Sequence, residues 1–184
     1  MIVILNSILI FFALLYTGIV LYMRRGWSII PYFSSTRDIH TSVSIIIAAR
    51  NEEANIARTI DAIMSQNFPK DKLELIIVDD HSSDRTAEIV KSYADQGVRL
   101  LQLDVGDALN SYKKYAISKA IELSTGEIIV TTDADCRMGS EWLATVIRYF
   151  ETNQCYMVSS PVVYSEEKNS FEKLQTLEFL YLIG

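Results

Sequence analysis

Two pairs of neighbouring acidic residues each follow a short apolar run. Asp133 and Asp135, one residue apart, end one run, and Asp79 and Asp80 end another. Such runs predict buried strands. Because ligands bind at the carboxyl ends of the strands in open α/β sheets, we expect both pairs to lie at one crevice. Paired carboxylates there could hold Mg²⁺ or Mn²⁺ against a phosphate group.

Each acidic pair also has a purely structural interpretation. Asp133 and Asp135 could belong to a solvated turn, and Asp79 and Asp80 to the turn that continues through His81. An isolated Asp-x-Asp pattern arises often by chance. Its position at a strand end, repeated in the second pair, favours a ligand site.

The elements that must position these acids alternate along the chain. Helix-like periodicity, as in Ile56, Ile60 and Ile63, separates strand-like apolar runs. The expected strands are Val43 to Ala48, Leu73 to Val78, Val98 to Leu103, Ile128 to Thr131 and Tyr156 to Val163. Further helices are expected around 116–121, 142–150 and 171–184. This alternation predicts an α/β fold with a mostly parallel sheet and helices on both faces.

An apolar segment precedes the predicted domain. As a helix, residues 1–23 would span about 33 Å, against a hydrocarbon core of about 30 Å, so we expect one transmembrane helix. A cleaved signal peptide is the alternative, but the segment lacks a basic start and a small-residue cleavage site. Residues 24–41 are expected to be a juxtamembrane linker. Arg24 and Arg25 follow the helix, which predicts a single-pass protein of the cell membrane with residues 42–184 in the cytoplasm.

Composition excludes several classes of function. The formal net charge is -6, and residues 42–184 hold 14 basic against 22 acidic side chains, so no nucleic-acid partner is expected. Cys136 and Cys155 form no metal-binding or disulfide pattern, which fits a reducing compartment.

Three ordered motifs resemble the family 2 glycosyltransferases of the GT-A fold. They are Val43-Ser-Ile-Ile-Ile-Ala-Ala-Arg-Asn-Glu-Glu53, Ile76-Ile-Val-Asp-Asp-His-Ser-Ser-Asp-Arg-Thr86 and Thr125-Gly-Glu-Ile-Ile-Val-Thr-Thr-Asp-Ala-Asp135. The resemblance implies a Rossmann-like GT-A domain and an inverting enzyme. Such an enzyme would transfer a sugar from a nucleotide diphosphate donor with Mg²⁺ or Mn²⁺. The implied partners are a nucleotide-sugar donor, a lipid or polysaccharide acceptor, and the membrane.

The same resemblance implies site residues. Those expected at the nucleotide sugar are Ala48, Arg50, Glu52, Asp79, Asp80, Lys113, Asp133 and Ala134, while Asp135, with Asp133, is expected on the metal. Lys113 would face the diphosphate, although a solvated helix position is the alternative. The chain departs from the family pattern at Ala48, where Pro is common, at Arg50, where Tyr is common, and at His81, where Gly is usual. We expect His81 to be a turn residue.

The catalytic base is not identified. Glu166 and Glu167 are the only paired acids after Asp135, and their polar surroundings favour a surface role. We therefore expect the chain to hold the donor half of an enzyme, with the domain incomplete at its carboxyl end and the base beyond Gly184. Two alternative functions remain, a sugar nucleotidyltransferase and a non-catalytic nucleotide-binding module.

Overall fold

The computed structural model describes residues 2–103, 112–153, 155–163 and 169–183, and it separates into two units. Residues 35–160 form one unit, and residues 1–34 with 161–184 form the other. The helices are α1 (Ile2–Ile29), α2 (Ile56–Met64), α3 (Thr86–Lys91), α4 (Tyr112–Leu123), α5 (Trp142–Asn153) and α6 (Ser170–Ile183), with short 3₁₀ turns at Lys70–Lys72 and Ala94–Gln96. The strands are β1 (Val43–Ala49), β2 (Leu73–Asp79), β3 (Val98–Gln102) and β4 (Ile128–Asp133).

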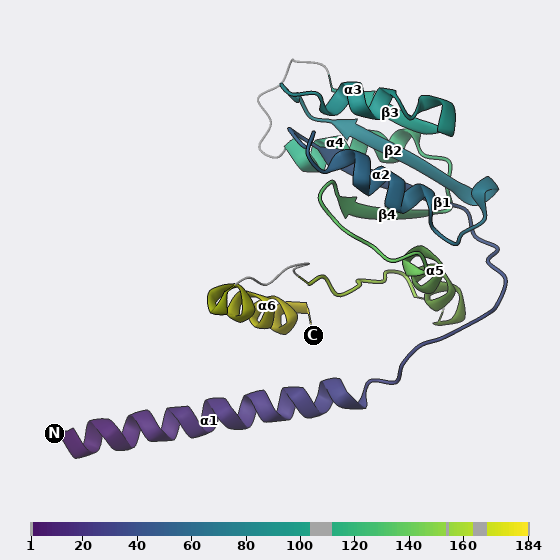
Figure 1. Cartoon of the computed structure of the whole chain (residues 1–184). Helices are drawn as coiled ribbons and strands as arrows, with labels where there is room; N and C mark the ends of the chain where they lie inside the picture. Colours follow the sequence, from purple (N-terminus) through teal and green to yellow (C-terminus); the bar gives the residue numbers. More distant parts are fainter. Residues whose placement is uncertain (1, 104–111, 154, 164–168, 184) are drawn as a thin grey trace. The chain divides into compact units, whose positions relative to one another are not determined.

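The four strands form one parallel sheet in the order β3-β2-β1-β4 (Figure 1). The two central strands, β1 and β2, are buried over most of their length, as their continuous apolar sequences predict. Register aligns the strand ends: Ala49 pairs with Asp79, and Ala48 with Asp133. Both acidic motifs therefore lie at the same edge of the sheet.

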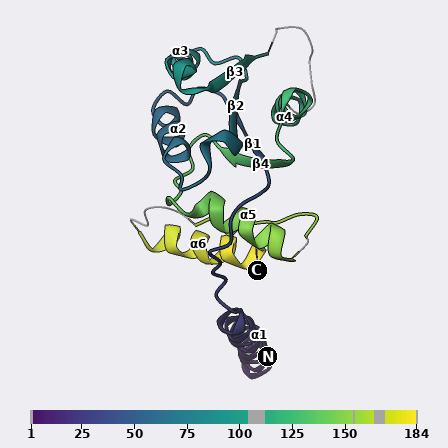
Figure 2. The ribbon, with the colours of Figure 1, turned by 90° about the vertical axis from the view of Figure 1, so that its right-hand side faces the viewer.

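Helices cover both faces of the sheet. On one face, α2 and α3 pack through Ile56, Ile60 and Val90 against apolar side chains of β1 and β2. On the other face, α4 packs through Ala116 and Ala120 (Figure 2). The structure confirms the predicted α/β fold with a parallel sheet between helical layers.

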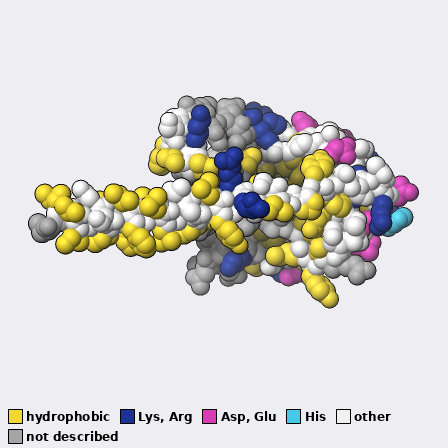
Figure 3. Space-filling model, turned by 90° about the horizontal axis from the view of Figure 1, so that it is seen from below, with side chains coloured by type: hydrophobic (Ala, Val, Ile, Leu, Met, Phe, Trp, Pro, Cys, Tyr) yellow, Lys and Arg dark blue, Asp and Glu magenta, His cyan; other side chains and the backbone are white. Residues whose placement is uncertain are grey.

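The α1 helix is long and apolar enough to cross a membrane, and it is the single helix among the described residues with these properties. Hydrophobic side chains are exposed along it (Figure 3). It continues six residues past the expected boundary at residue 23 and ends at Ile29. Pro31 explains this end point, because the residue before a proline is disfavoured in helical conformation.

Polar contacts fix residues 37–41, which lead into β1. One Glu151 carboxylate oxygen of α5 accepts hydrogen bonds from the amides of His40 and Thr41, at 3.0 Å each, and from the Thr41 hydroxyl at 2.8 Å. Lys72 Nζ donates to the carbonyls of Ile39 and His40 at 2.8 and 2.9 Å. We call these contacts the entry clamp. They hold the chain at the amino end of β1.

One expected strand does not form. Residues 155–163 adopt no strand, and Tyr156 and Met157 are largely exposed. The prediction of a strand from Tyr156 to Val163 is therefore wrong: an apolar run becomes a strand only where a neighbouring edge pairs with it. Glu166 and Glu167 lie outside the described residues.

Candidate functional site

A pocket of about 270 Å³ opens at the carboxyl edge of the sheet. It collects residues that are far apart in sequence because β1, β2 and β4 all end there. Its lining residues are Ala48, Ala49, Arg50, Glu52, Asp80, Lys113, Asp133, Ala134 and Asp135. Four of them carry carboxylates and two carry cationic groups, so the pocket has a surplus of negative charge.

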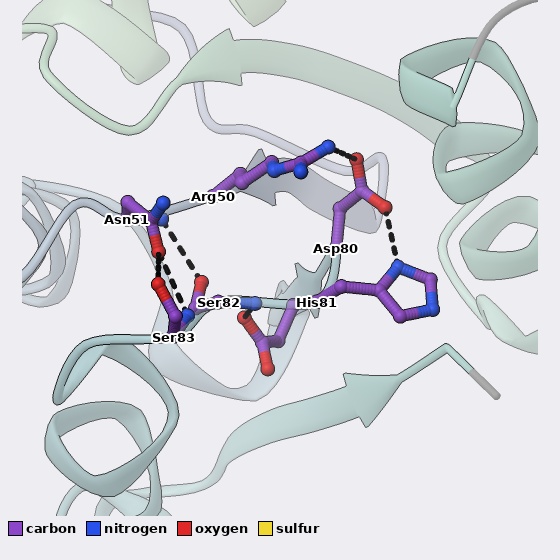
Figure 4. Close-up of polar contacts among 7 residues, drawn as sticks. Arg50, Asn51, Asp80, His81, Ser82 and Ser83 are labelled. Carbon is purple, nitrogen blue, oxygen red and sulfur yellow. Dashed lines mark hydrogen bonds and ion pairs between the residues drawn. The ribbon is translucent and has the colours of Figure 1, made fainter. Parts of the chain in front are cut away.

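Asp80 is the most enclosed acid of this pocket. Its side chain is 9% exposed and lies between two basic side chains (Figure 4). His81 Nδ1 is 2.9 Å from Asp80 Oδ1, and an Arg50 guanidinium nitrogen is 4.0 Å from Oδ2. His81 is a turn residue, as expected, but its bond to Asp80 was not foreseen.

Hydrogen bonds join the loop after β1 to the loop after β2. The Asn51 amide donates to the Ser82 hydroxyl at 3.0 Å, while Asn51 Oδ1 accepts from the Ser83 amide at 2.8 Å (Figure 4). Asn51 and His81 both have left-handed backbone conformations, with φ of 55° and 56°. Such conformations are costly for residues other than glycine and are kept where surrounding contacts fix them. The two loops thus form one preorganised wall of the pocket.

A further set of contacts supports this wall. The Glu52 amide donates to the Thr86 hydroxyl at 2.8 Å, and the Glu53 amide donates to Asp84 at 3.0 Å. Asp84 also accepts from the Thr86 amide at 3.0 Å, at the start of α3. Desolvation would raise the pKa of Asp84, but hydrogen bonds from Thr86 and Glu53 lower it overall. Asp84 therefore stays ionised and keeps the two loops together.

Asp133, the last residue of β4, and Asp135 lie at a tight turn. The Cys136 amide donates to the Asp133 carbonyl at 3.3 Å, and Asp133 and Asp135 are both exposed. Thr59, fully buried on α2, donates its hydroxyl proton to the carbonyl of Ala134 at 2.6 Å. Thr59 thereby fixes the turn that presents both acids to the pocket.

Lys113 connects α4 to this turn. Its Nζ is 2.6 Å from Asp133 Oδ1, and both side chains are more than half exposed. The structure thus brings Lys113 into the pocket, where its cation lies beside the acidic turn.

Asp79 is the one predicted site residue that does not line the pocket. It is 4% exposed, and its carboxylate accepts from the Ser82 amide at 3.2 Å and from Gln102 Nε2 at 3.3 Å. These contacts assign Asp79 to the support of the loop after β2.

The residues present fit a divalent cation shared with a ligand. Mg²⁺ is commonly held by one or two carboxylates together with substrate phosphates. Asp133 and Asp135 supply such a pair, and the surplus negative charge of the pocket would repel a diphosphate unless a cation were present. In the described part of the chain, no three His, Cys, Asp or Glu side chains form an all-protein metal cage.

The sequence interpretation missed the residues that position the site. Thr59 lies in none of the three motifs, and Asn51 and Ser82 lie in two of them but were not singled out. The hydrogen-bond partners of these residues are 31 to 75 residues away in the chain. Ala49 was also missed, although it directly follows the predicted Ala48 at the end of the strand. The left-handed position of His81 was signalled indirectly, because glycine is usual there in the family that the motifs resemble.

The parallel sheet and its helical layers define a GT-A-like α/β protein. Residues 44–183 match the sequence profile described as Glycosyl transferase family 2. The chain belongs to this family, as its three motifs predict.

Relatives and solved structures agree with this family. Beta-monoglucosyldiacylglycerol synthase of Trichormus variabilis is 32% identical over 129 residues, which cover 70% of this chain and 28% of that protein. Glycosyltransferase AglE of Haloferax volcanii is 37% identical over 101 residues, covering 55% of this chain and 33% of that protein. The chain therefore spans about a third or less of the length of these relatives.

Among solved structures, mannosyltransferase PcManGT from Pyrobaculum calidifontis, in complex with GDP-Man and Mn²⁺, aligns with a TM-score of 0.54 at 27% identity. The alignment covers 79% of this chain and 41% of that one. This likeness agrees with the GT-A-like fold of the sheet and helices.

Proposed function

We propose that this chain holds the donor site of an inverting glycosyltransferase. Such an enzyme transfers the sugar of a nucleoside diphosphate sugar with the help of Mg²⁺ or Mn²⁺. The observation that carries the proposal is the shared pocket. It brings Asp80, just after β2, to the same edge as Asp133, at the end of β4, and Asp135, just after it, with Lys113 beside them. A nucleotide sugar presents a hydrogen-bonding nucleoside and an anionic diphosphate, and the pocket offers groups suited to each.

The nucleoside would lie against the wall formed by the loops after β1 and β2. Asp80 would accept a hydrogen bond from the base or the ribose, because its carboxylate is enclosed and held in place. Arg50 and Glu52 line the same pocket, and the small side chain of Ala48 would leave room for a flat ring.

The diphosphate would lie over the turn after β4. Asp133 and Asp135 would hold the divalent ion, which when bound acts as a Lewis acid on the departing diphosphate. Lys113 would place a cation beside the same phosphates, and Ala134 would leave space for them. Transfer would proceed by attack of an acceptor hydroxyl on the anomeric carbon. The residue that takes the acceptor proton is not assigned.

We further propose that α1 anchors the protein in the cell membrane with the donor site in the cytoplasm. The length and apolar surface of α1 support anchoring, although signal sequences share these properties. Arg24 and Arg25 near its end support the cytoplasmic orientation. A lipid or polysaccharide acceptor would suit an anchored enzyme, and the Trichormus variabilis relative is named for a monoglucosyldiacylglycerol product.

Calorimetry with UDP and GDP, in Mn²⁺ and then in EDTA, tests the donor site. We expect binding in Mn²⁺ that EDTA removes, and Asp135→Asn should weaken binding in Mn²⁺ by about tenfold or more. Asp95→Asn is a matched control, since Asp95 is exposed in the turn before β3. Equal affinity in the two buffers would refute the metal role, and no binding of either nucleotide would refute the donor site.

A further inference from the structure

His81 occupies a position where its side chain is costly to place. The residue has a φ of 56°, in the left-handed region that suits glycine and disfavours side chains with a β-carbon. A histidine persists in such a conformation when contacts of its side chain or its neighbours fix it. Its ring contacts Asp80, the residue before it, so this contact helps to fix the conformation.

The ring of His81 and the carboxylate of Asp80 fix each other. His81 Nδ1 is 2.9 Å from Asp80 Oδ1, a distance at which the Nδ1–H tautomer of the ring donates a hydrogen bond to a carboxylate. The imidazole is 28% exposed and the carboxylate 9%, so both groups are partly shielded from water. Asp80 Oδ2 is on the side of Arg50, 4.0 Å from its guanidinium. His81 therefore holds one carboxylate oxygen and leaves the other beside the pocket.

We propose that His81 is a positioning residue for the nucleoside of the donor, acting through Asp80. This inference rests on the proposed donor site and adds to it a residue that lies outside the pocket lining. By restraining the rotation of the Asp80 side chain, His81 keeps the second oxygen ready to accept a hydrogen bond from the base or ribose. Nucleoside binding then costs less conformational free energy, because the Asp80 side chain is already ordered before the nucleoside binds.

Two substitutions at position 81 separate positioning from folding. His81→Gly removes the ring and relieves the left-handed backbone, so it should leave the melting temperature unchanged or raised. Its affinity for UDP or GDP in Mn²⁺ should nevertheless fall by about two- to tenfold, the effect of losing one ordinary hydrogen bond. His81→Asn should keep most of the affinity, because asparagine tolerates this conformation and its amide can donate to Asp80.

A double-mutant cycle with Asp80→Asn tests whether His81 acts through Asp80. The full 184-residue chain in detergent micelles is titrated with whichever nucleotide the unaltered protein binds more tightly. In the Asp80→Asn background, His81→Gly should have almost no further effect, since coupled residues are not additive.

Several results would overturn the proposal. They are an unchanged affinity of His81→Gly, an equal loss in both backgrounds, or a His81→Asn affinity as low as that of His81→Gly. If the unaltered chain binds neither nucleotide, the donor site fails and this inference fails with it. If Asp135→Asn and EDTA act as expected while His81→Gly binds normally, the donor site stands and the role of His81 is refuted.

Discussion

Gly126, just before β4, lies against the start of the central strand β1. A β-carbon at this position would be 2.4 Å from the Ser44 amide nitrogen, 2.6 Å from the Val43 carbonyl carbon and 2.7 Å from Ser44 Oγ. Such atoms normally approach to about 3.5 Å. Two of the three atoms belong to the backbone of a strand held on both sides by β2 and β4, so they cannot move aside cheaply. Gly126→Ala should therefore destabilise the domain.

The size of this effect follows from two contributions. Forcing a methyl group into packed structure costs about 1 to 3 kcal/mol. The Gly126 amide also donates to the buried Ser44 hydroxyl at 2.8 Å, and displacing it would cost about 1 kcal/mol more. For a domain of this size, a total of about 2 to 4 kcal/mol corresponds to a fall in melting temperature of about 8 to 16 °C.

Thermal unfolding followed by circular dichroism measures the change. Gly139→Ala is the matched control, because a β-carbon there would meet nothing within 4 Å, and it should change stability by less than about 0.5 kcal/mol. Equal melting temperatures of Gly126→Ala and Gly139→Ala would show that the close approach of Gly126 to β1 does not exclude a side chain at position 126.

Three further predictions concern the site and the chain entry. Lys113→Ala should weaken UDP or GDP binding by about tenfold with little change in melting temperature, since the Lys113–Asp133 pair is exposed; Lys114→Ala should change neither, and calorimetry with both variants decides. Burial alone would raise the pKa of Glu151, but hydrogen bonds from Thr41 and the His40 amide lower it overall from 4.5. Its contribution to unfolding free energy should thus be full above about pH 4.5 and be lost as pH falls through the lower folded-state pKa. Urea unfolding between pH 7 and pH 3 should show that the unfolding free energy of Glu151→Gln falls less on acidification than that of the unaltered protein. An equal fall in both proteins would contradict this. A reporter fused after Ser42 should be active only in the cytoplasm of a bacterial host, and activity outside it would reverse the proposed orientation.

The fold was predictable because its central strands have apolar sequences that are recognisable without knowledge of the rest of the chain. Continuous apolar runs such as 43–49 and 73–79 are long enough to be strands and too apolar for an exposed face, so a parallel sheet between helices followed. The same argument failed at 155–163, where Ser159, Ser160 and Pro161 interrupt the apolar run and no strand forms. Strand pairing depends on the partner edge, which local composition does not report.

The pocket was partly predictable for a related reason. The acids at the ends of β2 and β4 are conspicuous in sequence, and strand order brings them to one edge. Thr59 and Asn51 are not conspicuous, because their hydrogen bonds reach residues that only the folded chain places nearby. Sequence therefore indicates the groups that would touch a ligand better than it indicates the groups that hold them in place.

The entry clamp has a mechanical consequence. Force applied to the chain before Arg37 would be resisted by three side chains before it reached β1. Glu151 and Lys72 belong to the entry clamp, and Arg148 Nε donates to the Arg37 carbonyl at 3.0 Å. Any remaining force would act on β1, which is hydrogen-bonded to β2 and β4 and extends about 20 Å to the pocket. Several hydrogen bonds would have to break together for tension to reach Asp80. With α1 anchored as proposed, movements of the chain before Arg37 would be resisted at the amino end of β1, and the loops at the carboxyl end would keep their geometry.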